Sequence, residues 1–267
     1  MVIKMLDKIS TDLDLYLEGT SEMPCFSKVV ILNEHEYGSA SYLAMRSIIG
    51  KQKPIGRFIS KMIGENVFNT VPDTEEIGWP MYIHDGTLFL LLSSWPPTPV
   101  YPPDAASGTW IYIYPVVRDI VTYLQGKGCE EIIFLTSATL HEVLSEDFPE
   151  LSNNRVYQWR WNESKGTRKS LFLPPPAWLF CYLGSKLGID SRLFTTGHDS
   201  DKTVDIKAGK TLAGGISKHL NKSWGIVNFD TAVDEISTLH DKINEMKSVA
   251  LENARDKPAV PNQMLWG

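Results

Sequence analysis

Short apolar runs alternate along this chain with longer segments in which apolar residues recur every three or four positions. Three of the runs are four or five residues long and contain almost no polar side chain. Unbroken runs of this length are typical of strands that are covered on both faces, as in a parallel sheet. We therefore predict three central strands: Val29–Leu32, Leu88–Leu92 and Ile132–Leu135.

Weaker strand patterns surround these three runs. Asp85-Gly86 separates two apolar segments, Met81–His84 and Thr87–Leu92, which is a strong short-range signal for a hairpin. Aromatic residues alternate with polar ones from Tyr157 to Trp161, so that strand should have one aromatic face. Two further strands are predicted at Ile55–Ser60 and Ile189–Thr195.

Helical spacing appears between the predicted strands, and glycine follows several of these segments. A proline run, Pro174–Pro176, precedes one of them, and proline is tolerated in the first turn of a helix. Strands that alternate with helices over about 200 residues are typical of an α/β fold with a mainly parallel sheet, flanked by helices on both faces. The predicted helices are Ala40–Ile48, Ile111–Gln125, Ala177–Leu187 and Gly209–Leu220.

A further helix is predicted after Asp230, a good N-cap residue. Its apolar residues alternate at spacings of three and four over two heptads, so this helix either packs on its own domain or projects toward a sister subunit. The pattern divides the chain into an N-terminal extension at 1–26, an α/β core domain at 27–228, a C-terminal amphipathic helix at 229–254 and a flexible tail at 255–267. The apolar positions of the seam are Ile236, Leu239, Ile243, Met246 and Ala250.

The tail carries Pro258 and Pro261 and then ends in Met264-Leu265-Trp266-Gly267. Proline cannot extend a helix and favours an extended path that is accessible to water. An aromatic residue beside a free carboxylate has to find a pocket or remain in water. The tail therefore either docks into another protein or folds back so that Trp266 fills a pocket of its own domain.

Composition limits the classes of function. The chain has 267 residues, of which 43% are hydrophobic and 22% charged, as in ordinary globular proteins. Its formal net charge of −6 argues against a nucleic-acid or anionic-membrane surface. Three scattered cysteines fit a reducing cytosol, and neither a signal sequence nor a membrane-spanning run is evident. We expect a cytoplasmic protein with no nucleic-acid and no membrane partner.

No group of residues forms a convincing catalytic or metal site. The glycine-rich phosphate-binding patterns and the Gly-x-Ser-x-Gly nucleophile elbow are absent from the sequence. His35 lies between two glutamates, but neighbouring side chains of an extended segment point in opposite directions. His141 follows a strand end, and His198-Asp199 offers a base with an orienting carboxylate but no nucleophile. We therefore expect no catalytic residue, no metal and no cofactor.

Four segments together carry a family resemblance: Gly38–Leu43, Leu88–Ser93, Gly126–Leu135, and Ala177–Leu187 with the Gly188-Ile189-Asp190 that follows. With this layout, which covers about Val29 to Leu220, the chain resembles the proteasome assembly chaperone family, in particular its archaeal members. The resemblance implies a nucleoside-phosphorylase-like α/β fold that has lost the enzyme's site, in agreement with the missing catalytic motifs.

Several members of that family end in a hydrophobic-tyrosine-any tripeptide that docks between subunits of the proteasome α-ring. Leu265-Trp266-Gly267 is similar in position and type, with tryptophan in place of tyrosine. Indole keeps the flat apolar body but replaces the phenolic oxygen with an N–H donor. The resemblance thus implies Leu265, Trp266 and Gly267 as partner-binding residues, with the α subunits of the 20S proteasome and the chain itself, as a homo-oligomer, as partners.

Two classes of function remain. The first is a non-enzymatic chaperone or adaptor that docks its tail on the 20S proteasome. The second is a small-ligand or nucleoside-type transferase that uses the loops near 136–142 and 197–202. The two classes differ in whether they require the tail, because an adaptor needs Leu265-Trp266-Gly267 whereas an enzyme does not.

Overall fold

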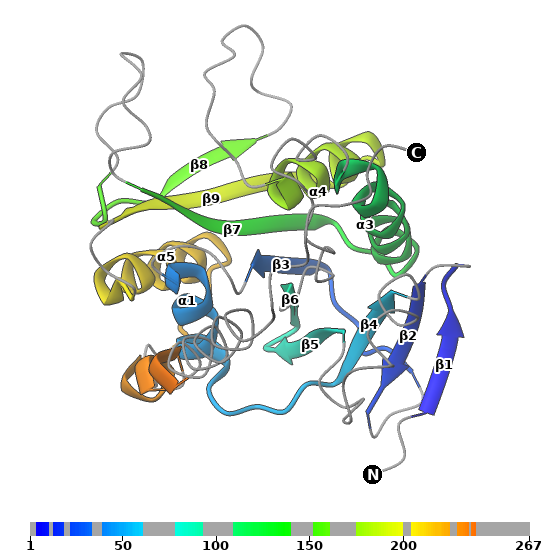
Figure 1. Ribbon diagram of the computed structural model, residues 1–267, viewed down its shortest axis with the longest axis horizontal. Coiled ribbons are helices and arrows are strands. Elements are labelled where there is room, and N and C mark those ends of the chain that lie inside the picture. The colour runs from blue at the N-terminus through cyan, green and yellow to red at the C-terminus, as the bar shows by residue number, and fades with distance from the viewer. Residues whose placement is uncertain are drawn as a thin grey trace, which may run out of the picture.

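Nine strands of the described chain form one mixed sheet with helices on both faces (Figure 1). Along the sheet the strands follow the order β1-β2-β4-β5-β6-β3-β7-β9-β8. The computed structural model describes residues 4–10, 13–18, 22–33, 39–60, 78–92, 109–139, 152–160, 175–199, 204–224, 229–234 and 236–238.

The centre of the sheet is parallel. Strand β3 (Lys28–Asn33) pairs in parallel with β6 (Thr87–Leu92) on one side and with β7 (Glu131–Thr139) on the other. Strand β9 (Asp190–His198) continues this arrangement beside β7. The predicted central strands are confirmed, since β3, β6 and β7 lie side by side in the middle of the sheet and their apolar residues are buried.

Outside this centre the sheet is antiparallel, so the prediction of a mainly parallel sheet is wrong for the described strands. Five of their eight pairings are antiparallel. A parallel pair needs a long crossover, whereas a short turn joins antiparallel neighbours. The antiparallel strands are β1 (Lys4–Lys8), β2 (Leu13–Leu17), β4 (Gly56–Ser60), β5 (Trp79–His84) and β8 (Tyr157–Arg160).

Strands β1 and β2 fall within the segment 1–26 that was predicted to be an extension, and neither strand was predicted. Strand β2 pairs with β4 along its whole length. Leu13, Leu15 and Leu17 are at most 2% exposed and belong to a core cluster of the domain. This part of the N-terminal segment is therefore built into the sheet.

The predicted hairpin is confirmed. Strands β5 and β6 pair antiparallel, with His84 opposite Thr87. Asp85 and Gly86 both have positive φ angles, 50° and 74°, which is the backbone of a type I′ turn. Lys222 also fastens this turn, because its Nζ atom lies 2.9 Å from Oδ2 of Asp85.

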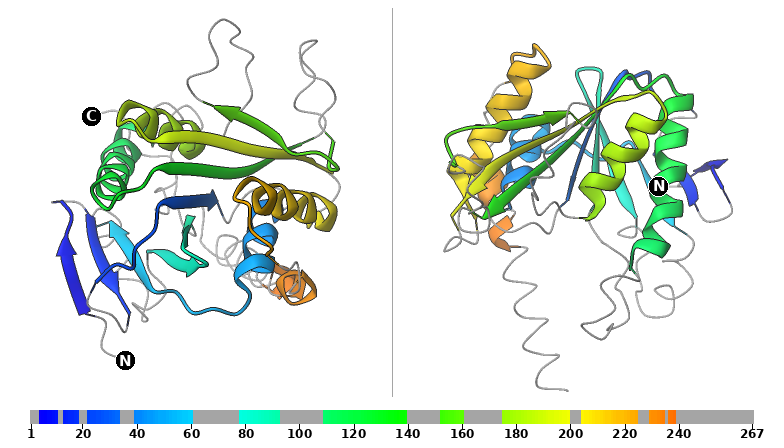
Figure 2. Two further views of the ribbon diagram at one scale, coloured as in Figure 1. Left: turned by 180° about the vertical axis from the view of Figure 1, so that it is seen from behind. Right: turned by 90° about the horizontal axis from the view of Figure 1, so that it is seen from above.

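Helices α1 (Ala40–Ile49) and α5 (Ile206–His219) lie on one face of the sheet, and α3 (Thr109–Gly126) and α4 (Pro175–Lys186) lie on the other, as Figure 2 (right) shows. Alternate residues of the central strands supply the two cores. Val30 and Leu32 belong to the cluster under α1 and α5, and Val29 and Ile31 to the cluster under α3 and α4. All four helices predicted within the core are present, with ends that differ by a few residues.

The start of the predicted C-terminal helix is also helical, at residues 229–234 and 236–238. Phe229, Ala232 and Ile236 are buried against the same core as α1 and α5. These turns therefore pack on their own domain, and the remainder of the helix predicted to residue 254 lies outside the described residues. None of the helices in the described ranges is both long and apolar enough to cross a membrane.

Candidate functional site

The predicted partner-binding residues Leu265, Trp266 and Gly267 lie outside the described residues. His35 and His141 also lie outside them, as do residues 140–142 and 200–202 of the loops assigned to a transferase. Docking by the tail thus stays a prediction, and the described chain offers two other polar regions, one at each end of the parallel strands.

The first polar region lies at the carboxyl ends of the parallel strands, where open α/β sheets bind ligands. His198 is the last residue of β9, is 2% exposed and lies opposite Thr139 of β7 in the ladder. Nearby, Asp205 caps helix α5. Its Oδ1 accepts a hydrogen bond from the backbone N–H of Ala208 and its Oδ2 one from that of Asp199, both at 3.0 Å.

Threonine hydroxyls at the same edge hold the chain that leads into β8. Oγ1 of Thr196 lies 3.2 Å from the carbonyl oxygen of Ser152 and 3.0 Å from that of Arg155. Oγ1 of Thr211, on α5, donates to the carbonyl oxygen of Asn153 at 2.7 Å. These contacts fasten residues 152–155 to β9 and α5. The predicted residue His198 therefore lies at a built and buried polar edge, although no sequence signature marks a nucleophile there.

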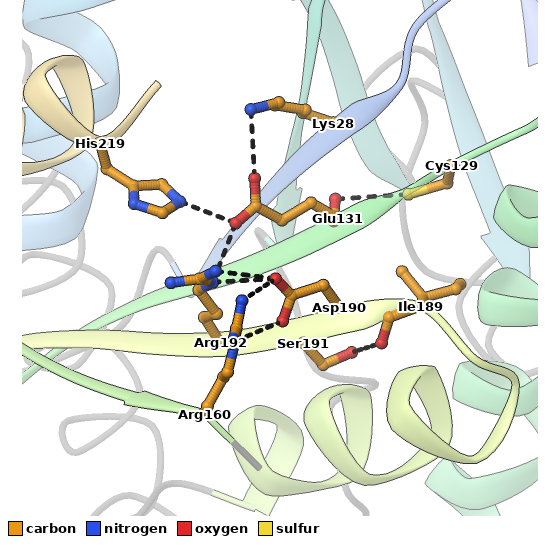
Figure 3. A network of polar contacts seen from close by, with 9 residues as sticks. All are labelled: Lys28, Cys129, Glu131, Arg160, Ile189, Asp190, Ser191, Arg192 and His219. Carbon is orange, nitrogen blue, oxygen red and sulfur yellow. Dashed lines mark hydrogen bonds and ion pairs between the residues drawn. The ribbon is translucent and has the colours of Figure 1, made fainter. Parts of the chain in front are cut away.

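The second polar region is a charge network at the opposite, amino ends of the parallel strands (Figure 3). Its centre is Glu131, the first residue of β7, whose side chain is 9% exposed. Oε1 of Glu131 accepts a hydrogen bond from Nε2 of His219 at 2.7 Å and lies 3.1 Å from Nε of Arg192. Oε2 lies 3.4 Å from Nζ of Lys28.

Asp190, the first residue of β9, forms the second half of this network. Arg160 donates two hydrogen bonds to its carboxylate, from Nε to Oδ1 at 3.0 Å and from Nη2 to Oδ2 at 2.9 Å. Arg192 also donates from Nη2 to Oδ2, at 2.8 Å. Arg160 and Arg192 are directly opposite in the β8–β9 ladder, where like charges repel, and the shared carboxylate of Asp190 offsets that repulsion.

Both carboxylates stay ionised because of these donors. Burial raises the pKa of Glu131, but the hydrogen bond from His219 and the charges of His219 and Lys28 outweigh it, so this pKa lies below its ordinary value. Partial burial likewise raises the pKa of Asp190, and the hydrogen bonds from Arg160 and Arg192 lower it by more. Glu131 and Asp190 are therefore anchors for cations and are poorly suited to accept a proton near neutral pH.

The network joins β3, β7, β9, β8 and the end of α5 at one edge, which gives it a structural role. Its members lie far apart in the sequence: Glu131 and His219 are 88 positions apart. None of these residues was predicted to be a site residue, because each is an ordinary charged residue within or beside a predicted element. Only their meeting at the sheet edge distinguishes them.

The two buried thiols, those of Cys129 and Cys181, are not suited to act as nucleophiles. Burial raises the pKa of Cys129 to about 12 and that of Cys181 to about 12. Only a thiolate attacks well, so both are inert near neutral pH. Within the described ranges, no three His, Cys, Asp or Glu side chains gather into a group that could hold a metal ion.

Comparison with solved structures identifies proteins that have the same architecture. No protein-family model and no curated protein match the sequence. Pyrococcus furiosus PbaA, an archaeal homolog of proteasome-assembly chaperone, superposes with a TM-score of 0.56 at 15% identity, over 91% of this chain and 99% of that one. Pyrococcus furiosus PbaB, an archaeal proteasome activator, gives 0.58 at 14% identity, over 88% of this chain and 100% of that one. The chain has the fold of these proteins.

A protein of unknown function from Thermoplasma acidophilum shares the same architecture, with a TM-score of 0.58 at 13% identity over 87% of this chain and 92% of that one. The resemblance to proteasome assembly chaperones, first drawn from four segments of sequence, is therefore confirmed at the level of the fold. At these identities the likeness concerns the path of the backbone.

Proposed function

We propose that this chain is a non-enzymatic proteasome assembly chaperone or adaptor. It acts in the cytoplasm as a homo-oligomer and docks Leu265-Trp266-Gly267 on the α-ring of the 20S proteasome. The observation that carries the proposal is the fold it shares with PbaA and PbaB over nearly the full length of both chains. The nucleoside-phosphorylase-like character implied by the family resemblance is part of the proposal.

The chemistry of the tail supports the docking step. Leu265 and Trp266 supply an apolar group and a flat aromatic ring at the end of a proline-containing segment. The carboxylate of Gly267 would pair with a lysine in the receiving pocket as a charge-assisted contact. One tail binds weakly because ordering it offsets much of the contact energy, and several tails on one oligomer bind tightly through effective concentration.

The described polar groups also favour a protein that binds over one that catalyses. Glu131 and Asp190 are held ionised by fixed cations, and the two buried thiols have a pKa of about 12. These groups supply neither a general base nor a nucleophile near neutral pH. They support a role in which the domain is a rigid carrier for a binding segment.

Binding of the full-length chain to immobilised, purified 20S proteasome tests the proposal. Deleting Leu265-Trp266-Gly267 should abolish binding, Trp266→Ala should come close to abolishing it, and Trp266→Tyr should retain or strengthen it. Molecular mass by light scattering and the melting temperature should be the same for every variant, so that a loss of binding reports the tail alone. Equal binding by the truncated chain would show that the tail is not the docking element.

The alternative is a small-ligand or nucleoside-type transferase that acts at the carboxyl edge of the sheet. It is favoured by one observation, the buried His198 at the end of β9 beside the Asp205 cap of α5. Turnover of nucleosides that is lost in His198→Ala and unaffected by deletion of the last three residues would support the transferase against the adaptor.

A further inference from the structure

Four helices end at the same edge of the sheet. Helices α1, α3, α4 and α5 each run back from the carboxyl ends of the parallel strands to the amino ends, beside the charge network (Figures 1 and 2). Contacts at the helix ends confirm this position. Nε2 of Gln125, on α3, donates to the carbonyl oxygen of Leu187 after α4 at 2.7 Å, and His219 at the end of α5 contacts Glu131.

An exposed lysine lies in the last turn of each helix or just after it. We call these five residues the lysine edge: Lys51 and Lys53 after α1, Lys127 after α3, Lys186 at the end of α4, and Lys218 in the last turn of α5. Each is exposed, and the ammonium groups of Lys127 and Lys186 lie over the rings of Tyr123 and Tyr182, at 5.3 and 5.6 Å from the ring centroids.

The lysine edge differs from the cations beside it, because those cations already have carboxylate partners. Lys28 and Arg192 contact Glu131, Arg160 contacts Asp190, and Lys222 contacts Asp85. No member of the lysine edge forms an ion pair with a carboxylate of the described residues. The turns that follow the four helices, at residues 50–55, 127–130, 187–189 and 220–224, contain one carboxylate, that of Glu130.

Helix dipoles account for the placement of the lysines but do not cancel their charge. The C-terminus of each helix carries roughly half a negative elementary charge, so the four helix ends offset about two of the five positive charges. The edge therefore stays positive on a chain whose net charge is −6. Lys51, Lys53 and Lys218 lie at the ends of the helices on one face of the sheet, and Lys127 and Lys186 lie at the ends of the helices on the other, so the lysine edge borders the amino ends of the strands from both faces.

We propose that the lysine edge is a docking surface for an acidic segment of a partner protein, a run of Asp and Glu side chains in an extended conformation. An extended segment that crosses the amino ends of the strands would lie between the lysines of the two faces. A protein segment is the favoured occupant, because the net charge of −6 disfavours a nucleic-acid partner. The guanidinium groups that could hold a phosphate with two bonds, those of Arg160 and Arg192, are already bound to Asp190 and Glu131.

The test is the fluorescence anisotropy of a labelled deca-glutamate peptide titrated with the full-length chain at low ionic strength. We expect saturable binding that weakens as salt is raised, because exposed charges are screened beyond a Debye length of about 10 Å at 0.1 M. Lys127→Gln with Lys186→Gln should weaken binding by about five-fold, as expected for two lost exposed ion pairs. Changing all five lysines to glutamine should remove binding.

The matched control is Arg155→Gln with Lys207→Gln, which removes the same charge from exposed residues at the opposite edge of the sheet. This control should bind the peptide like the unchanged chain. Equal weakening in the two double variants would overturn the proposal, because binding would then follow net charge and not position. Absence of binding by the unchanged chain, or tighter binding of a ten-nucleotide DNA than of the peptide, would also overturn it. The readout does not involve the 20S proteasome, so its outcome is independent of the proposed tail docking.

Discussion

The carboxylate of Glu131 contacts the side chains of His219, Lys28 and Arg192 in place of water, and its side chain is only 9% exposed. Removing one partner of a buried charge group leaves the others without compensation. We expect Glu131→Gln to lower the free energy of unfolding by about 2–4 kcal/mol, measured by urea denaturation at neutral pH. Glu130→Gln is the matched control, since Glu130 is exposed and should change stability by no more than about 0.5 kcal/mol.

The same residue predicts a pH dependence. Because the pKa of Glu131 is lower in the folded chain than its ordinary value of 4.5, its stabilising effect is fully present above that value and is lost as the pH falls through the folded value. The difference in stability between the unchanged chain and Glu131→Gln should therefore narrow as the pH is lowered from about 7 to about 3. A constant difference across this range would mean that the carboxylate contributes through its shape and not through its charge.

The packing of helix α5 depends on the close approach of Gly209 to α1 and to Phe229. A Cβ atom on Gly209 would lie 2.8 Å from Cβ of Leu43 on α1 and 3.1 Å from the ring of Phe229. Gly209→Ala should push these elements apart and destabilise the domain by about 1–3 kcal/mol, measured by thermal unfolding. Gly214→Ala, in the same helix but with no atom within 4 Å of the added Cβ, should stabilise it by about 0.5–1 kcal/mol. If both changes were stabilising, α1 and α5 would not be in the contact described.

For the molecule as a whole, the two ends of the chain should behave in opposite ways. Removing residues 1–18 takes away β1 and β2, and with them the buried Leu13, Leu15 and Leu17. We expect this variant to lose cooperative thermal unfolding and to bind a dye that reports exposed apolar surface. Removing residues 255–267 should leave the melting temperature and the oligomer size unchanged. A cooperative transition at the original temperature without residues 1–18 would contradict the role of β2 in the core.

Local patterns in the sequence determined the elements that depend mainly on their own residues. The apolar runs of β3, β6 and β7 predicted central strands because a strand covered on both faces needs apolar side chains in both directions. Asp85-Gly86 predicted the hairpin because two positive φ angles are least costly there. The alternation of Leu13, Leu15 and Leu17 with Asp14 and Tyr16 is a further strand signal, present in the sequence, that marks β2.

Only the tertiary structure decided the features that join distant residues. Nothing near Glu131 in the sequence indicates His219 or Arg192, because the contact exists only once α5 and β9 return to the start of β7. The antiparallel pairing of β2 with β4 and of β8 with β9, and the need for glycine at position 209, likewise depend on which elements become neighbours. The lysine edge belongs to the same class. Each lysine is an ordinary helix-end residue, and it is the common direction of four helices that gathers them on one side of the molecule.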